Sequence, residues 1–592
     1  MVETQVAAST LCEAFQATVA RSGDAVALRT KGDATRITWR EYGARVRAIA
    51  GGLAGLGVRH GDALGILMCN RPEFNLVDTA AMHLGATPFS MYLTSAPDQL
   101  RYLVADSGAR VIATERAQLA RLRALGLPDV TVIVVDGDGD GEHVLSLAQL
   151  AAKTRPDFDF DAAWRAVAPD TVLTLIYTSG TTGDPKGVEL THANMLAELA
   201  GMLTLRPIDH EPRIISYLPH AHIADRFGTH YIPILRGGSV TACPDPRALL
   251  EHVLDVQPSD FTGVPRVWEK LKAGIEAKLA TEAPERRALI HGAIEASLTK
   301  VRLEAAGQPV PAELAAGVAR AEAMLFTPLR AALGFSQTRA YFVGAAPSTR
   351  EVLEFFYALG MPICEVWGMS ELSCVATAMP VGSTRIGTVG VALPGVELRL
   401  ADDGELLVRG AIAMRGYRNK PELTRDTIDR DGWLHTGDIA ELSADGYVRI
   451  VDRKKEILIS AGGKNMSPAN IEARLKAASL LVGQAAVIGD ARPYVVALLV
   501  LDPDGAMAFC KARNIDLPLA ALVEHHAVRA EIDRAIAAAN EQLSRVEQIK
   551  RYALLPAEWM PGGDELTPTM KLKRKGIAAK YAREIEALYT DA

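Results

Sequence analysis

The chain has 592 residues, of which 49% are hydrophobic and 23% are charged, and its formal net charge is −7. A chain of this length exceeds the size that one hydrophobic core organises, so we expect two or more domains. The balanced charge excludes the one-sided basic surface of a nucleic-acid-binding protein, and the hydrophobic share excludes a disordered or fibrous chain.

The six cysteines lie far apart in the sequence and form no Cys-x-x-Cys pair. This spacing argues against a zinc site or a disulfide framework and favours a reducing compartment. The first residues, MVETQVAASTLCEAF, lack the basic region and the sustained apolar stretch of a signal peptide, and no run of about 18 apolar residues follows. We therefore expect a cytoplasmic protein, and we leave a peripheral contact with a membrane open.

The first third of the chain alternates between helical and strand-like patterns. Apolar residues in 41–56 recur at helical spacing, whereas 63–68 and 130–135 are short β-rich runs. Helices interleaved with buried strands predict a layered α/β architecture for residues 10–170.

A long helix-rich stretch occupies residues 270–335, with a break at 308–311 where two prolines occur. The apolar residues that recur there at three- and four-residue spacing are Leu289, Ile290, Ile294, Leu298 and Val301. This pattern predicts an amphipathic helical insertion.

From residue 397 onward the pattern changes to short strands separated by glycine turns, as in 405–409, 446–451 and 457–460. A strand-like run at 494–501 and an Ala/Glu-rich helix at about 528–545 follow. These features predict a compact α/β unit in the last part of the chain.

The segment 177–188, YTSGTTGDPKGV, carries the strongest chemical signal. It follows an apolar strand at 172–176 and precedes a helix that begins near Thr191. Small residues let backbone amides approach phosphate oxygens, the Thr and Ser hydroxyls donate hydrogen bonds, and Lys186 supplies a mobile positive charge. The segment is not a Walker loop, which requires Gly-Lys-Ser/Thr, because a proline precedes Lys186 and a glycine follows it. We interpret it as a loop that binds phosphate.

This loop, with its Pro-Lys-Gly ending, resembles the signature of the adenylate-forming superfamily, which includes acyl-CoA synthetases, firefly luciferase and peptide-synthetase adenylation domains. Four further segments resemble family motifs in the expected order: the aromatic-Gly-x-Thr-Glu segment at 367–371, the ribose-binding turn at 433–438, the hinge at 452–456 and the catalytic-lysine segment at 566–574. Ser370 replaces the commoner threonine and keeps the hydroxyl. The resemblance implies an α/β fold in which a large N-terminal domain with layered sheets and helices, residues 1–452, precedes a small mobile domain, residues 453–592.

The chemistry that the resemblance implies begins with ATP. A carboxylate is a poor electrophile, so its attack on the α-phosphate first gives a mixed anhydride, acyl-AMP, and releases pyrophosphate. By resemblance, Thr181 and Glu371 hold Mg²⁺, and the loop from Thr178 to Lys186 embraces the β- and γ-phosphates. Lys571 reaches the α-phosphate and the carboxylate.

For the nucleotide, Trp367 offers a flat face to adenine and Asp438 accepts from the ribose hydroxyls. A core tryptophan and a solvated aspartate are the alternatives for these two residues taken singly. The residues expected to bind nucleotide are Thr178, Ser179, Gly180, Thr181, Thr182, Gly183, Gly344, Ala345, Ala346, Trp367, Gly368, Ser370, Asp438 and Arg453.

The segment PHAHIAD at 219–225 clusters two histidines and an aspartate, which suggests a metal site. No further His/Cys cluster completes such a site. The family places an aromatic residue or a histidine at the position of His222, near the acyl carboxylate, so His222 takes that role. We interpret His220 and Asp225 as structural.

Transfer to a thiol requires the small domain to rotate, withdraw Lys571 and build a pantetheine channel, according to the resemblance. Lys455 is the hinge candidate and Asp452 the alternative. Gly462, Gly463 and Lys464 lie on the expected path of the thiol, where small residues permit close backbone approach.

Three features resemble long-chain acyl-CoA synthetases: Met570 before the lysine, where many relatives have glycine, the segment FTGVPRVWEK at 261–270, and the helical insertion. We therefore expect a long-chain fatty acid–CoA ligase that uses ATP, Mg²⁺ and coenzyme A, with no nucleic-acid partner. An acyl-AMP ligase that loads a carrier protein and a non-catalytic nucleotide- or lipid-binding relative are the alternatives. Sterol side-chain, bile and aryl acids stay open as substrates, and the oligomeric state is not predicted.

Overall fold

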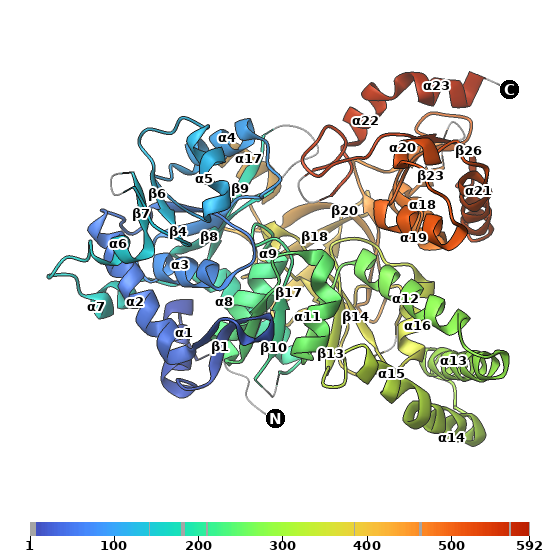
Figure 1. Ribbon diagram of the computed structural model, residues 1–592, viewed down its shortest axis with the longest axis horizontal. Coiled ribbons are helices and arrows are strands. Elements are labelled where there is room, and N and C mark those ends of the chain that lie inside the picture. Colours follow the sequence, from blue (N-terminus) through green and yellow to red (C-terminus); the bar gives the residue numbers. More distant parts are fainter. Residues whose placement is uncertain are drawn as a thin grey trace.

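The computed structural model describes residues 7–140, 143–178, 184–208, 211–383, 385–460, 464–567 and 570–590. These form a large body and a smaller one, which holds the orange and red end of the chain at the upper right of Figure 1. Within the described ranges, none of the helices combines the length and the apolar character that crossing a membrane requires.

The first sheet of the large body is entirely parallel, in the order β4-β3-β5-β6-β7. Its strands are β3 (Ala63–Leu67), β4 (Thr87–Ser90), β5 (Val111–Thr114), β6 (Thr131–Val134) and β7 (Val144–Ser146). Every residue of β3 is buried, as expected for a parallel strand covered on both faces. Helix α2 (Trp39–Gly55) packs against α3 (Pro72–Met82), which contacts β3 and β4, and Thr38 and Glu41 form a capping box at the start of α2. The predicted helix and strands of this region are confirmed.

Among the described residues, four more sheets complete the large body, in the orders β10-β11-β1-β2, β12-β13-β14-β15-β16, β19-β9-β8 and β17-β18-β20-β21. The strands of the first two are β1 (Val26–Thr30), β2 (Arg36–Thr38), β10 (Arg213–Ser216), β11 (Ser239–Ala242), β12 (Asp260–Gly263), β13 (Ala340–Val343), β14 (Ile363–Trp367), β15 (Thr377–Ala378) and β16 (Val391–Ala392). The strands of the other two are β8 (Val172–Thr178), β9 (Lys186–Thr191), β17 (Val396–Leu400), β18 (Glu405–Gly410), β19 (Gly416–Tyr417), β20 (Leu434–Leu442) and β21 (Val448–Arg453).

The predicted insertion is helical and projects at the lower right of Figure 1. Its elements are α12 (Pro265–Ala280), α13 (Pro284–Ala305), α14 (Ala312–Ala321), the π-helix η4 (Glu322–Phe326) and α15 (Thr327–Ala332). The break falls between α13 and α14, as expected. Ile290 and Ile294 pack against a core that includes Trp268 and Phe356. Leu289, which the spacing placed on the same apolar face, is instead 64% exposed.

The small body has its own core. A sheet of β24 (Val482–Ile488), β25 (Val495–Leu501) and β26 (Ile549–Leu555) contacts α18 (Pro468–Ala478) and shares its buried core with α21 (His526–Glu541) and α22 (Arg574–Lys580). All seven residues of β25 are buried. The buried residues of the two clusters that form this core run from Leu458 to Ile585.

The two bodies meet on two sides. Arg266 at the start of α12 donates to Asp502 of the small body (2.9 Å) and to the carbonyl of Val482 (3.3 Å). One helical turn further, Lys270 pairs with Asp504 at 2.9 Å. On the other side, a Cβ on Gly562 would lie 2.3 Å from the carbonyl oxygen of Thr94, so only glycine fits there.

Candidate functional site

The two strands that flank the predicted phosphate loop pair with each other. Strands β8 and β9 are antiparallel, and Thr178 faces Lys186 in their register. Sequence reasoning did not foresee β9 and placed only a helix after the loop. That helix, α8 (His192–Leu205), begins where expected, with Thr191 as its N-cap. Ser179, Gly180, Thr181, Thr182 and Gly183 lie outside the described residues.

Lys186, Tyr417 and Glu371 come together beside these two strands. The ammonium of Lys186 lies 5.2 Å from the centroid of the Tyr417 ring, a cation–π distance. The Tyr417 hydroxyl donates to Oε1 of Glu371 at 2.8 Å. Burial, with the Glu371 charge adding to it, raises the pKa of Tyr417, so its hydroxyl stays protonated.

Glu371 projects from a short helical turn, η5 (Ser370–Leu372), directly after β14. The side chain of Glu371 is buried, with 8% exposed. Gly368 permits this turn, because a Cβ there would lie 2.0 Å from the carbonyl oxygen of Cys374. Among the described residues, only Tyr417 hydrogen-bonds to the carboxylate, so Oε2 is left to accept from another group.

The two residues expected at adenine and ribose touch each other. The indole N–H of Trp367 donates to Oδ2 of Asp438 at 2.9 Å, and Nε of Arg453 pairs with Oδ1 at 2.8 Å. Trp367 is only 9% exposed and belongs to an apolar core, which agrees with the alternative that it is a core residue. Burial raises the pKa of Asp438, although Arg453 opposes that effect. Each carboxylate oxygen keeps a second acceptor position.

Lys571 comes from the small body and lies close enough to groups of the large body to interact with them electrostatically. Its side chain is exposed to solvent although many protein atoms surround it. Desolvation, followed by the charge of Arg453, lowers the pKa of Lys571, whereas Asp438 and Glu371 raise it. The positive charge of Lys571 also acts on His222, whose pKa burial lowers to about 4. Lys571 thus lies within electrostatic reach of all four residues.

His222 caps the short helix α9 (Ile223–Asp225), because its Nδ1 accepts from the amide of Ala224 at 3.1 Å. His220 and Asp225 pair with each other at 2.6 Å, and the His220 ring stacks on Phe74 with centroids 3.5 Å apart. Within the described ranges, no group of three His, Cys, Asp or Glu side chains is arranged to hold a metal ion.

The expected adenine wall follows strand β13. A Cβ on Gly344 would lie 2.9 Å from a methyl group of Val366, whereas Ala345 and Ala346 are exposed. Ala345 has a φ of +71°, a left-handed conformation that alanine rarely adopts. Ser370 is half-buried at the start of η5.

The expected hinge lies where the large body ends. Asp452 in β21 is buried and accepts hydrogen bonds from the hydroxyl of Ser467 and from the amide of Arg453, the latter at 2.6 Å. Ser467 is the N-cap of α18, so Asp452 joins the two bodies. Lys455 is exposed in a turn, and Lys464 is exposed beside Ser460. Gly462 and Gly463 lie outside the described residues.

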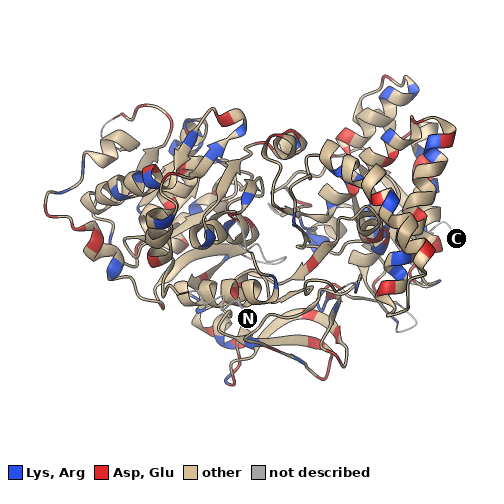
Figure 2. Cartoon of the chain, turned by 90° about the horizontal axis from the view of Figure 1, so that it is seen from below, with Lys and Arg blue, Asp and Glu red and all other residues tan. Residues whose placement is uncertain are grey.

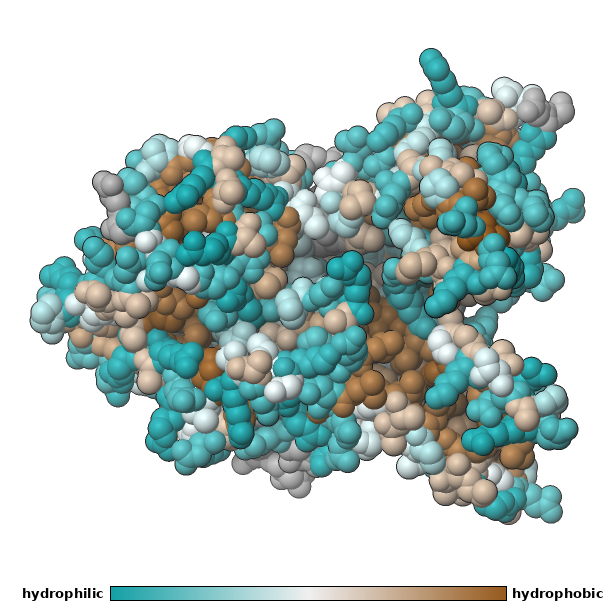
Figure 3. Space-filling model, viewed as in Figure 1, coloured by the Kyte–Doolittle hydropathy of each residue, from teal (hydrophilic) through white to brown (hydrophobic). Residues whose placement is uncertain are grey.

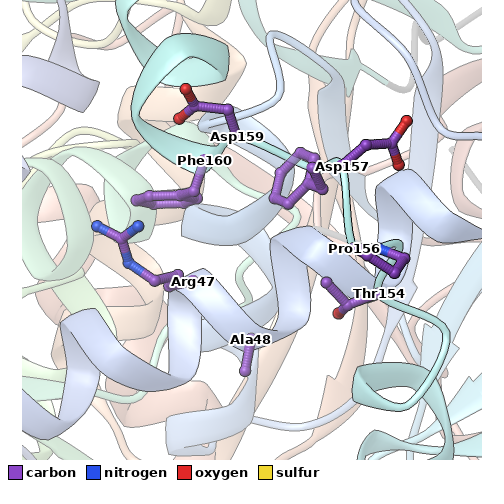
Figure 4. A pocket seen from close by; sticks show the side chains of 8 residues that line it. Arg47, Ala48, Thr154, Pro156, Asp157, Asp159 and Phe160 are labelled. Atoms are coloured by element: carbon purple, nitrogen blue, oxygen red, sulfur yellow. The ribbon is translucent and has the colours of Figure 1, made fainter.

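A separate cleft of about 470 Å³ holds none of the predicted residues. It lies between α2 and residues 154–160, and Figure 4 shows the Arg47 guanidinium over the Phe160 ring, 4.4 Å from its centroid. Arg47 also pairs with Asp161. The charged group of Arg47 in this cleft therefore already has partners within the chain.

Sequence reasoning missed Tyr417 and Glu198. Tyr417 meets Glu371 across 46 residues of sequence, and Glu198 bonds the backbone of Val375 across 177. No local pattern marks either residue, because the partners come from different strands and helices.

Comparison with known proteins shows which family this chain belongs to. Residues 15–418 match the family described as AMP-binding enzyme. The chain belongs to the AMP-binding enzyme family. Residues 455–592 match the C-terminal domain of AMP-binding enzymes.

Relatives of this AMP-binding enzyme include long-chain-fatty-acid–CoA ligase FadD15 of Mycobacterium bovis, 36% identical over 94% of this chain and 92% of the relative. A second is fadD11 of Mycobacterium tuberculosis, provisionally named a fatty-acid–CoA ligase and 50% identical over 75% of this chain and 78% of the relative. A third is long-chain-fatty-acid–CoA ligase ACSBG2 of Gallus gallus, 31% identical over 99% and 82%.

Solved structures share the fold of this AMP-binding enzyme. The adenylation domain of a carboxylate reductase from Mycobacterium chelonae has a TM-score of 0.75 at 20% identity, covering 98% of this chain and 91% of that one. The O-succinylbenzoate–CoA synthetase of Bacillus subtilis, solved with ATP and magnesium, has a TM-score of 0.67 at 20% identity, covering 95% and 98%. The expected architecture of a large N-terminal and a smaller C-terminal domain is confirmed.

Proposed function

We propose that this enzyme activates a long-chain fatty acid with ATP to acyl-AMP and then transfers the acyl group to coenzyme A. The observation that carries this proposal is Lys571, which reaches from the small body toward His222, Glu371 and Asp438 of the large body. A cation at this point meets the negative charge that develops when a carboxylate attacks the α-phosphate. The named relatives support the same reaction.

Each group has a defined task in the first step. Lys571 binds the acid carboxylate and the α-phosphate and holds them in line. His222, with a pKa of about 4, is neutral near pH 7, so it can donate a hydrogen bond to the carboxylate without adding a second positive charge beside Lys571. Lys186 stabilises the negative charge of the departing pyrophosphate. No side chain forms a covalent bond to the substrate in this scheme.

The nucleotide is held by groups that the fold brings together. Asp438 accepts from the ribose hydroxyls with the acceptor positions that Trp367 and Arg453 leave free. Adenine packs between the Trp367 edge and the wall at 344–346. The hydroxyls of the phosphate loop at 178–183 complete the phosphate contacts.

The residues present fit Mg²⁺. Glu371 offers a carboxylate oxygen that accepts no hydrogen bond from a described residue, and oxygen is the ligand that this hard cation prefers. Mg²⁺ usually keeps several waters and takes substrate phosphates, so one protein carboxylate with the Thr181 hydroxyl suffices. When bound, it neutralises charge on the phosphates.

The second step requires the small domain, residues 453–592, to rotate about the hinge at Asp452 or Lys455. This motion withdraws Lys571 and opens a path for the thiol beside Gly462, Gly463 and Lys464. The contacts of Arg266, Lys270 and Gly562 between the bodies then break and re-form. The motion therefore makes acyl-AMP formation precede the transfer to the thiol.

The acid has an apolar chain in this proposal. Figure 3 shows an apolar surface between α11 (Leu249–Val256) and α12. On α11, Leu250 is 54% exposed and Leu254 53% exposed. An apolar chain that enters near this surface would lose its contact with water, at about 0.8 kcal/mol for each buried methylene. Charged groups of both signs are interspersed in the view of Figure 2, so nothing on that face favours a nucleic acid.

The test is pyrophosphate release by purified protein with ATP, Mg²⁺ and a panel of carboxylic acids, with and without coenzyme A. We expect release with long-chain fatty acids and the corresponding acyl-CoA as product. If acyl-AMP persists in the presence of coenzyme A but its acyl group is transferred to a supplied carrier protein, the carrier-loading alternative is favoured. If no acid in the panel causes pyrophosphate release, the proposed enzymatic activity is refuted.

A further inference from the structure

The turn that presents Glu371 is strained. Ser373 has a φ of +67° and a ψ of −41°, and the amide of Cys374 donates to the carbonyl of Leu372 at 2.8 Å. This is the rare form of γ-turn, centred on a serine with no exposed surface. Residues held in such conformations persist only when their surroundings over-determine them, and they cluster at functional sites.

Three hydrogen bonds hold this turn from outside. The Ser373 hydroxyl donates to the carbonyl of Ile412 at 2.8 Å, and the amide of Met414 donates to the carbonyl of Glu371 at 2.8 Å. The third bond comes from a side chain. The amide of Val375, two residues after the strained serine, donates to Oε1 of Glu198.

Glu198 is an unusual residue for this position. It lies inside α8, fully buried, and burial raises its pKa well above the ordinary value. Among the described residues, its second oxygen has no hydrogen-bond partner. Burying a half-satisfied carboxyl costs free energy, so an apolar residue would stabilise this helix better unless the bond to Val375 has a use.

We propose that Glu198 is a positioning residue that holds the strained turn and thereby aims the Glu371 carboxylate at the metal and phosphates. Helix α8 follows directly on β9, which begins at Lys186. One continuous segment therefore carries Lys186 in its strand and fixes the Glu371 turn with its helix. This inference rests on the proposed function, since it assigns Glu371 to the metal.

The first test is hydrogen exchange of the Val375 amide in the full chain. Glu198→Leu removes the acceptor and keeps an apolar side chain of similar size, whereas Glu198→Gln keeps an acceptor oxygen. We expect Val375 to lose protection in the leucine variant and to keep it in the glutamine variant. If the leucine variant does not fold, Glu198→Asp replaces it, because the shorter side chain also withdraws the acceptor.

The second test is Mn²⁺ binding, followed by electron paramagnetic resonance in the presence of α,β-methylene-ATP, which cannot release pyrophosphate. Loss of a group that orients a metal ligand typically weakens metal binding by about 10- to 100-fold, and we expect this loss for Glu198→Leu. The glutamine variant should restore the wild-type affinity. A role in stability alone would lower the unfolding temperature without moving the Mn²⁺ affinity.

The matched control is Glu354→Leu. Glu354 is also a buried glutamate, but it pairs with Arg302 and Arg350 next to the helical insertion. We expect its variant to lose stability and keep Mn²⁺ affinity. Wild-type Mn²⁺ affinity in Glu198→Leu overturns the inference, while wild-type protein that makes no acyl-AMP overturns the proposed function instead.

Discussion

The indole N–H of Trp367 donates to the carboxylate of Asp438 at 2.9 Å, across 71 residues of sequence. This bond fixes the carboxylate that we assign to the ribose. Trp367→Phe removes the donor and keeps an aromatic ring. A hydrogen bond to a charged group contributes about 1.5–3 kcal/mol, so we expect the KM for ATP to rise roughly tenfold or more, with a much smaller change in the KM for the acid. Steady-state kinetics with each substrate varied in turn measures both.

The control for this variant is Trp559→Phe, which removes an indole bond to Tyr581 within the small body. It should leave the KM for ATP unchanged. A Trp367→Phe enzyme with wild-type ATP kinetics would show that the bond does not position the ribose ligand.

The backbone of the residue before Lys571 is strained. Met570 has a φ of +65° and is 48% exposed. A left-handed conformation costs a non-glycine residue about 1–2 kcal/mol, so Met570→Gly should stabilise the small domain, by about 1 kcal/mol or less after the entropy of glycine is counted. Urea unfolding measures this change. The opposite substitution, Gly562→Ala, should destabilise, because φ is +78° there and Thr94 leaves no room for a Cβ. If Met570→Gly lowers the free energy of unfolding, the inferred backbone strain at Met570 is contradicted.

Arg266 should bias the enzyme toward the first half-reaction. It is 25% exposed and bonds both Asp502 and a backbone carbonyl of the small body. Arg266→Ala removes these bonds from the conformation that places Lys571 in the site, so we expect acyl-AMP formation to slow more than thiolysis of supplied acyl-AMP. Single-turnover assays of each half-reaction compare the two rates.

Lys270→Ala supplies the comparison for Arg266. The Lys270–Asp504 pair is exposed, at 45% and 60%, and such pairs contribute little. Its half-reactions should stay close to wild type. An equal slowing of both half-reactions by Arg266→Ala would argue against a contact specific to one conformation.

The activity should depend on pH through Lys571. Desolvation and Arg453 lower its pKa in the free enzyme, so the amine loses its proton at a lower pH than an exposed lysine does. Because the charged form binds the phosphate, kcat/KM for ATP should fall on the alkaline side before the pH reaches the ordinary pKa of lysine, about 10.4. Lys571→Arg keeps the charge at all these pH values. The remaining activity of that variant should not decline at alkaline pH. If kcat/KM for ATP still falls with the same pH profile, a group other than Lys571 causes the decline.

Much of the fold could be predicted from the sequence because its signals are local. The apolar run of β25, the capping of α2 by Thr38 and Glu41, and the N-cap at Thr191 each arise from neighbouring residues. The strand β9 was missed because its pairing to β8 is a tertiary contact. Leu289 was misplaced because helical spacing identifies a stripe but not which of its residues a neighbour covers.

The candidate site was predictable only as a set of ordered segments. The resemblance supplied Lys571, Glu371 and Asp438, but not the contacts between them. Tyr417 and Glu198 act through partners far away in the sequence, and neither pattern nor spacing identifies such pairs. These contacts form only when the chain is folded, so the sequence alone does not identify them.

The central claim is that Lys571 serves acyl-AMP formation and then leaves the site. The direct measurement is Lys571→Ala in two separate assays: pyrophosphate release from ATP and a long-chain fatty acid, and acyl-CoA formation from supplied acyl-AMP. Removing a group that stabilises transition-state charge costs about 10²- to 10³-fold, and we expect this loss in the first assay with near wild-type rates in the second. An equal loss in both assays would contradict the account.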